Sequence, residues 1–239
     1  MIHLNCDIGE GLGNESLLIP FLSSCSIACG GHAGDATSID EVLRLTVGHD
    51  LTVGAHPSFP DRENFGRAAM QLSIPALQET LREQLGLMHE RSGRLHVKIE
   101  HVKAHGALYI ALSKDSEMAQ SFVAVAREIF PEAKIYAPFQ SVLASVALEN
   151  ECEVVYEAFA DRNYNDDLSL VSRESKSALV KDPGKILKHL ISLYHDSVVT
   201  TVTGKELTLC ASTFCVHGDN PNVLSILKNI RRHPKLNAV

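Results

Sequence analysis

Six short stretches of the sequence place acidic, basic or imidazole side chains directly after an apolar, strand-like run. They span residues 5–11, 29–35, 54–57, 103–109, 157–162 and 216–219. Carboxylates, imidazoles and ammonium groups that lie close together can move protons, hold a divalent metal or neutralise an anion. A single His beside a Gly is usually structural, but six such clusters at corresponding positions indicate a functional site.

The apolar runs alternate with patterns of helical period, which predicts parallel strands joined by crossover helices. Strands are expected over residues 2–8, 26–29, 51–56, 99–103, 134–137, 153–159, 198–202, 206–210 and 211–216. Gly204 and Lys205 separate two β-rich runs, so we expect one antiparallel hairpin there. About seven strand–helix units in a single domain, residues 1–239, favour an irregular (β/α) barrel over an open sheet.

Helix faces and helix starts support this division of the chain. Leu77, Leu81, Leu85 and Met88 recur at helical spacing and predict a buried helix face. Ser38 with Glu41 is typical of a capping box, and Asp182–Pro183 and Asn220–Pro221 of an N-cap followed by Pro. In a parallel barrel the strand ends meet at one mouth. The residues expected around that mouth are Asp7, His32, His56, His105, Glu157 and His217.

Composition excludes several classes of protein. The chain has 239 residues, 45% of them hydrophobic and 21% charged, which is typical of a globular protein. A net charge of −7 argues against nucleic-acid binding, and no apolar run is long enough to span a membrane. The first seven residues do not resemble a secretory signal, so we expect a cytoplasmic protein with reduced thiols. Cysteine chemistry is possible at Cys6 or Cys29, but no residue close to either in the sequence indicates a reactive thiolate.

The glycine-rich turn formed by Gly30, Gly31 and Gly34 has two interpretations. Backbone N–H groups ahead of a helix near Ser38 could bind a carboxylate or phosphate. The same glycines could simply make a tight strand-to-helix turn. The sequence contains no P-loop and no Gly-x-Ser-x-Gly nucleophile elbow.

Six strings, in this order, resemble the LamB/YcsF family: LNCDIGEG, ACGGHAGD, GAHPSFPDRENFGR, VKAHGALY, EAFADRNY and CVHGDNP. The resemblance covers about residues 2–230. It implies an α/β fold, a TIM-like seven-stranded (β/α) barrel similar to glycoside hydrolases and polysaccharide deacetylases. It also implies ATP-dependent opening of 5-oxoproline to L-glutamate, with separate B and C subunits as partners. Ala104, Ala68 and Ser177 depart from the family pattern.

Lactam chemistry suggests roles for the clustered residues. An unstrained lactam resists hydrolysis, so ATP would activate it, most simply as an O-phosphorylated imidate that water attacks with release of phosphate. The candidate catalytic residues are Asp7, Glu10, His32, Lys103 and His105. The candidate substrate-binding residues are Asp35, Arg62, Glu157, Asp161, Arg162, His217 and Asp219. Asp7, His32 and His56 are candidate ligands for Zn²⁺ or Mn²⁺, while Mg²⁺ would accompany ATP.

Two other functions stay open. The chain could be a metal-dependent amide hydrolase or deacetylase that acts alone, or a non-catalytic subunit that binds the lactam. A homo-oligomer is compatible with the sequence. Because a P-loop is missing, we expect the isolated chain not to open 5-oxoproline without its partners. We also expect Asp7→Ala or His32→Ala to abolish activity at nearly unchanged thermal stability.

Overall fold

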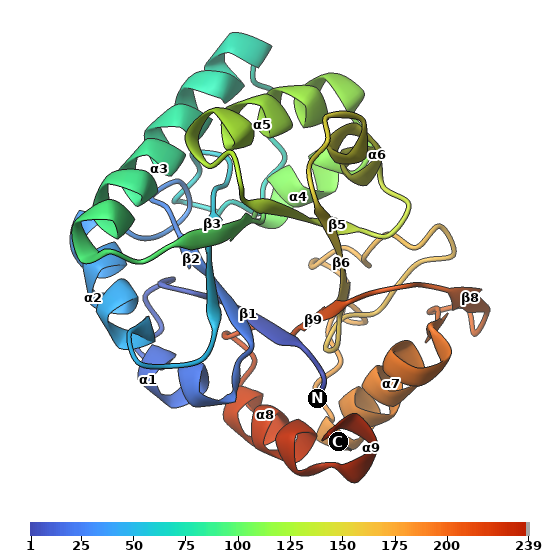
Figure 1. Cartoon of the computed structure of the whole chain (residues 1–239). Coiled ribbons are helices and arrows are strands. Elements are labelled where there is room, and N and C mark those ends of the chain that lie inside the picture. The colour runs from blue at the N-terminus through green and yellow to red at the C-terminus, as the bar shows by residue number, and fades with distance from the viewer. Residues whose placement is uncertain (238–239) are drawn as a thin grey trace.

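Seven parallel strands close into a barrel in the computed structural model, which describes residues 1–237 (Figure 1). The strand order around the barrel is β1, β2, β3, β4, β5, β6 and β9. The barrel strands are β1 Leu4–Ile8, β2 Ser24–Ala28, β3 Thr52–His56, β4 Ile99–Val102, β5 Lys134–Pro138, β6 Val154–Phe159 and β9 Thr213–Cys215. The prediction of an irregular seven-stranded (β/α) barrel is therefore confirmed.

Helices surround the barrel on its outside (Figure 1). They are α1 Glu15–Leu18, the 3₁₀ turn η1 Ile19–Phe21, α2 Ala36–Thr46, α3 Ile74–Leu95, α4 Gly106–Leu112, α5 Ser116–Ile129, α6 Val142–Glu149, α7 Pro183–Asp196, α8 Val223–Arg232 and α9 Pro234–Asn237. The predicted face of α3 is fully buried at Leu77, Leu81, Leu85 and Met88. No helix in residues 1–237 is both long and apolar enough to cross a membrane.

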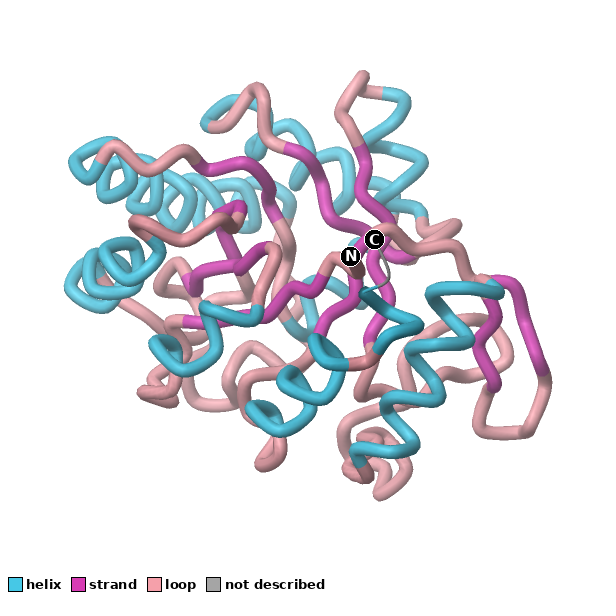
Figure 2. Tube along the Cα trace, turned by 60° about the horizontal axis from the view of Figure 1, so that its bottom comes forward, coloured by secondary structure: helices cyan, strands magenta, loops and turns pink. Residues whose placement is uncertain are grey.

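The predicted hairpin lies outside the barrel. Strands β7 Val198–Thr200 and β8 Glu206–Thr208 pair antiparallel with each other and form a separate two-stranded sheet (Figure 2). The chain then returns through β9, which pairs in parallel with both β6 and β1. The barrel is closed by this last strand, so the polar segment that follows β9 reaches the same mouth as the segment after β1.

Two of the predicted helix starts are wrong by a few residues. Helix α2 begins before Ser38, because Asp35 is the N-cap and forms the capping box with Ser38; Glu41 is not part of it. Helix α8 begins after Asn222 rather than at Pro221. The prediction at Asp182 is confirmed, since its carboxylate accepts the Lys185 N–H at 2.8 Å.

One close approach inside the barrel requires glycine. A Cβ on Gly54 of β3 would lie only 2.2 Å from Nε2 of His101 on β4. The His101 ring occupies that space, stacks on Tyr136 with ring centroids 4.0 Å apart, and lies 3.1 Å from the Ser26 hydroxyl. The glycine thus lets a buried imidazole fill the barrel interior.

Candidate active site at the barrel mouth

A cavity of about 820 Å³ opens where the parallel strands end. That volume lies in the usual range of small-molecule sites. Loops after β1, β3, β4, β5 and β9 line it, together with the long loop between β6 and α7, residues 160–182. Because all seven barrel strands are parallel, their polar ends converge here, as the sequence predicted.

Lys103 is the buried cation at the floor of the cavity. Its side chain is 2% exposed, and its Nζ lies 3.0 Å from Asp7 Oδ1 and 2.7 Å from Glu157 Oε1. Nζ also approaches Asn5 Oδ1 at 3.3 Å. Burial alone would lower the pKa of Lys103, but the charges of Asp7 and Glu157 outweigh it and the pKa is raised well above its usual value. Lys103 therefore stays charged.

Asp7 is held in its ionised form by its neighbours. Burial favours the neutral acid, but the charges of His56 and Lys103 outweigh that effect and hold the Asp7 pKa well below its usual value. Its Oδ2 lies 3.3 Å from His56 Nε2. Asp7 is thus a fixed negative charge.

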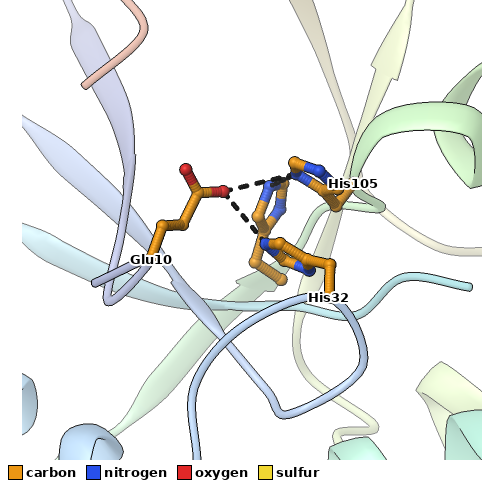
Figure 3. Close-up of side chains that lie close together, drawn as sticks. Glu10, His32 and His105 are labelled. Atoms are coloured by element: carbon orange, nitrogen blue, oxygen red, sulfur yellow. Dashed lines mark hydrogen bonds and ion pairs between the residues drawn. The ribbon is translucent and has the colours of Figure 1, made fainter. Parts of the chain in front are cut away.

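Glu10 and three histidines form a cluster beside this floor (Figure 3). Glu10 Oε1 lies 3.0 Å from Nε2 of His32 and 3.4 Å from Nδ1 of His105. His56 Nε2 lies 3.0 Å from the same Nδ1 of His105. One atom from each of Glu10, His32, His56 and His105 lies within 4.8 Å of all the others, so this group could hold a metal ion.

Two of the three imidazoles are held from behind by backbone carbonyls. His56 Nδ1 donates to the Lys103 carbonyl at 2.8 Å, and His105 Nε2 donates to the Phe65 carbonyl at 2.9 Å. The rings of His32 and His105 stack in parallel, with centroids 3.6 Å apart. Burial, together with the charges of His32 and His56, holds the His105 pKa well below its usual value, and burial also lowers the His32 pKa.

A second imidazole–carboxylate pair lies across the mouth. His217 Nδ1 is 2.7 Å from Asp161 Oδ1, and the buried Asp161 also accepts from the His217 N–H and from Asn220. Burial would raise the Asp161 pKa, but His217 outweighs it and the pKa is lowered. The carboxylate fixes the orientation of the His217 ring.

Two arginines that the sequence did not single out as substrate ligands meet at Asp219. Arg67 lies 2.7 Å and Arg173 3.2 Å from the same Oδ2 of Asp219. All three side chains line the cavity. Arg67 lies 152 residues from Asp219 along the chain, so neither a motif nor a period could have revealed this group. Two guanidinium groups share one carboxylate, which leaves donors and one net positive charge for an anion.

Tyr109 is another residue that the sequence did not identify. Its buried hydroxyl has no hydrogen-bond partner within residues 1–237, and Oε2 of Glu157 also has none there. Burial raises the pKa of Tyr109 well above its usual value, and the charge of Glu157 adds to the shift. Both side chains line the cavity and could bind polar atoms of a ligand.

Three of the predicted substrate ligands have structural contacts instead of free donors or acceptors at the mouth. Asp35 caps α2, so its own carboxylate accepts the helix N–H that one of the two interpretations of this turn gave to an anion. Arg62 donates to the carbonyls of Gly30 and Gly34, and neither Asp35 nor Arg62 lines the cavity. Arg162 does line it, but its guanidinium donates to the carbonyls of Val171 and Ala178 and holds the long loop.

The buried thiols offer no nucleophile. Burial raises the pKa of Cys6 well above its usual value and that of Cys29 to about 12. Both are therefore thiols near neutral pH, and Cys29 accepts the His56 N–H at 3.2 Å.

Comparison with known proteins agrees with this architecture. The sequence model of the LamB/YcsF family matches residues 2–239. The chain belongs to the LamB/YcsF family. Two proteins named as the A subunit of 5-oxoprolinase, from Staphylococcus aureus strains Newman and JH9, are 38% and 37% identical over 236 residues. Each match covers 96% of this chain and 94% of the relative.

A solved structure of the family has the same fold. The lactam utilization protein from Thermus thermophilus superposes with a TM-score of 0.87 at 30% identity. The superposition covers 95% of this chain and 94% of that one. Of the three departures from the family strings, Ala68 and Ala104 line the cavity, whereas Ser177 contacts Ser175 within the long loop.

Proposed function

We propose that this chain is the A subunit of an ATP-dependent 5-oxoprolinase, a hydrolase that opens 5-oxoproline to L-glutamate. The observation that carries the proposal is the match, along almost the whole chain, to relatives named for that subunit. A deep polar mouth with fixed charges and neutral imidazoles suits amide hydrolysis.

The reaction needs chemical activation of the lactam. ATP would transfer its γ-phosphoryl group to the lactam oxygen, which gives an O-phosphorylated imidate and ADP. Addition of water to the ring carbon, followed by cleavage of the C–N bond, leaves an amine and an acyl phosphate. A second water hydrolyses the acyl phosphate to L-glutamate and phosphate. The protein must therefore supply a base for water, an acid for the amine and cations for the anions.

When no metal is bound, Glu10 is the best placed base in this scheme. It lies on a turn between Gly9 and Gly11, both with positive φ, and its carboxylate contacts His32 and His105. Because burial lowers the pKa of both imidazoles, they are neutral near pH 7, and His32 orients the Glu10 carboxylate through its contact at 3.0 Å. Asp7 is a poor base, since His56 and Lys103 stabilise its ionised form.

The other side chains can receive the rest of the substrate. We assign the substrate carboxylate to Arg67 and Arg173, whose shared partner Asp219 orients them. The lactam N–H can donate to the Glu157 carboxylate, which lines the cavity. His217, held by Asp161, can return a proton to the leaving amine.

We propose that ATP with its Mg²⁺ is used only in the assembled enzyme with subunits B and C. This chain has no P-loop, and it carries a net charge of −7, which disfavours a polyanion. Separate subunits would therefore contribute to nucleotide binding and phosphoryl transfer.

Reconstitution tests the proposal directly. Glutamate release and 5-oxoproline-dependent ATP hydrolysis are measured for this chain alone, for B with C, and for all three together. We expect both activities only in the complete mixture. Robust turnover by the purified chain alone would contradict the need for partners, and no turnover by a folded complete complex would overturn the proposed function.

The cluster of Glu10 with three histidines gives some support to a second candidate, a metal-dependent amide hydrolase that acts alone. The same experiment separates the two, because such an enzyme would cleave amide or N-acetyl substrates without ATP. A third candidate, a non-catalytic subunit, would bind 5-oxoproline but show no loss of turnover when Glu10 is replaced by Gln.

A further inference from the structure

We propose that Glu10, His32, His56 and His105 bind one divalent metal ion, with Zn²⁺ as the best match. The proposal rests on the side-chain geometry and does not depend on the lactam reaction. It also changes the ligand set expected from the sequence, because Glu10 and His105 join His32 and His56 in place of Asp7.

The argument begins with the positions of two protons. A backbone carbonyl can only accept a hydrogen bond, so His56 must carry its proton on Nδ1, which faces the Lys103 carbonyl at 2.8 Å. By the same reasoning His105 carries its proton on Nε2, which faces the Phe65 carbonyl at 2.9 Å. In neutral rings the two remaining nitrogens are then acceptors.

These two acceptor nitrogens face each other and face carboxylates. His56 Nε2 and His105 Nδ1 are 3.0 Å apart. His105 Nδ1 is also 3.4 Å from Glu10 Oε1, and His56 Nε2 is 3.3 Å from Asp7 Oδ2. Lone pairs at such distances repel unless a cation lies between them. A buried site with converging lone pairs therefore needs either a bound proton or a metal ion.

The distances and the ligand types fit a metal. The close contacts within the group, 3.0, 3.0 and 3.4 Å, match the spacing of about 3.3 Å between nitrogen ligands of a tetrahedral Zn²⁺. The widest separation is within 4.8 Å, so side-chain shifts of about 1 Å would close the group. Three imidazoles and one carboxylate suit Zn²⁺ better than oxygen-seeking Mg²⁺.

The surroundings have the form expected around metal ligands. A ligating His usually donates its other N–H to a carbonyl or carboxylate, as both His56 and His105 do here. His32 differs, because its buried Nδ1 has no partner within residues 1–237. Asp7 is occupied by Lys103 and fits an outer position better than a direct ligand.

Zinc binding by the isolated chain tests the proposal. Chelator-treated protein is titrated with Zn²⁺ by calorimetry, and one ion per chain is expected. Co²⁺ in place of Zn²⁺ should give the visible absorption of a tetrahedral site. Glu10→Gln and His105→Gln should each weaken Zn²⁺ binding by about 100-fold or more, because each removes a ligand rather than an outer partner.

His96→Asn is the matched control. His96 is exposed after α3 with φ 54°, a conformation that Asn tolerates, so the variant should bind Zn²⁺ like the unchanged chain. Circular dichroism and thermal melts establish that each variant is folded. Absence of stoichiometric Zn²⁺ binding would show that the group holds only a proton and would reject the proposal. Unchanged binding by both folded ligand variants would reject it too.

Discussion

Lys103 and Asp7 form an ion pair where water is almost excluded. Glu157, at 2.7 Å, still balances the charge of Lys103 when Asp7 is neutralised, so the cost is that of lost hydrogen bonds to a charged group. We therefore expect Asp7→Asn to lower the free energy of unfolding by about 1.5–3 kcal/mol as well as abolish activity. This revises the expectation from sequence that stability would hardly change, because the sequence could not show that Lys103 is buried against Asp7.

Urea denaturation of Asp7→Asn and Asp166→Asn measures this effect. Asp166 pairs with Lys205 at 2.7 Å on the surface, where solvent screens the charges. The surface variant should lose far less stability than the buried one. Equal losses would mean that burial of the Lys103 pair has no special cost.

Arg173 provides a test of substrate recognition. If Arg67 and Arg173 bind the substrate carboxylate, Arg173→Gln should raise KM for 5-oxoproline about 10- to 100-fold in the assembled complex, with a smaller change in kcat. Steady-state kinetics at saturating ATP measures both values. Arg82→Gln is the control, because Arg82 pairs with Glu128 on the outer helices. A fall in kcat at unchanged KM would contradict the assignment.

At the scale of the elements, Gly54 shows how closely β3 packs against the His101 side chain of β4. A methyl group there would collide with the His101 ring, so Gly54→Ala should lower stability by about 1–3 kcal/mol or more. Gly86→Ala is the counterpart, since Gly86 lies in α3 with nothing within 4 Å of the added atom. It should raise stability by about 0.5–1 kcal/mol. Urea midpoints of the two variants should therefore move in opposite directions.

The type of most helices and strands could be predicted from the sequence, but contacts between residues far apart in the sequence could not. The periods of apolar residues identified the barrel strands, the buried face of α3 and the β7–β8 hairpin, because these signals are local. The start of α2 was misplaced because both Asp35 and Ser38 can cap a helix, and only the backbone geometry decides between them.

For the candidate site, the location could be predicted from the sequence, but several side-chain contacts could not. Its location followed from parallel strands whose polar ends share one mouth. The Asp219 pairing with Arg67 and Arg173, and the buried contacts of Arg162, depend on how long loops fold over that mouth. No period or motif in a single sequence encodes such contacts.

For the whole molecule, buried histidines predict sensitivity to acid. Burial lowers the pKa of His101 to about 3 and also lowers those of His32 and His105. Below about pH 6.5 the unfolded chain binds protons that the folded chain does not, so stability falls as the pH decreases. His101 alone would contribute a loss of about 3 kcal/mol between pH 7.5 and 4.5.

Urea denaturation of chelator-treated protein at these two pH values measures the loss. His96→Asn should show the same pH dependence as the unchanged chain, because His96 is exposed. A free energy of unfolding that stays constant over this range would mean that the histidines are protonated in the folded state.

The closure of the barrel by β9 has a consequence for folding during synthesis on the ribosome. The second edge of strand β1 is paired only when β9 is available, because Leu4 pairs with Phe214, which is 210 residues later in the sequence. Early strands can pair with one another during synthesis, but the barrel and its polar mouth cannot form until β9, Thr213–Cys215, has emerged. Until then one edge of β1 stays unpaired and can form non-native strand pairs. A truncated or stalled chain would carry that unpaired edge and would lack the assembled site.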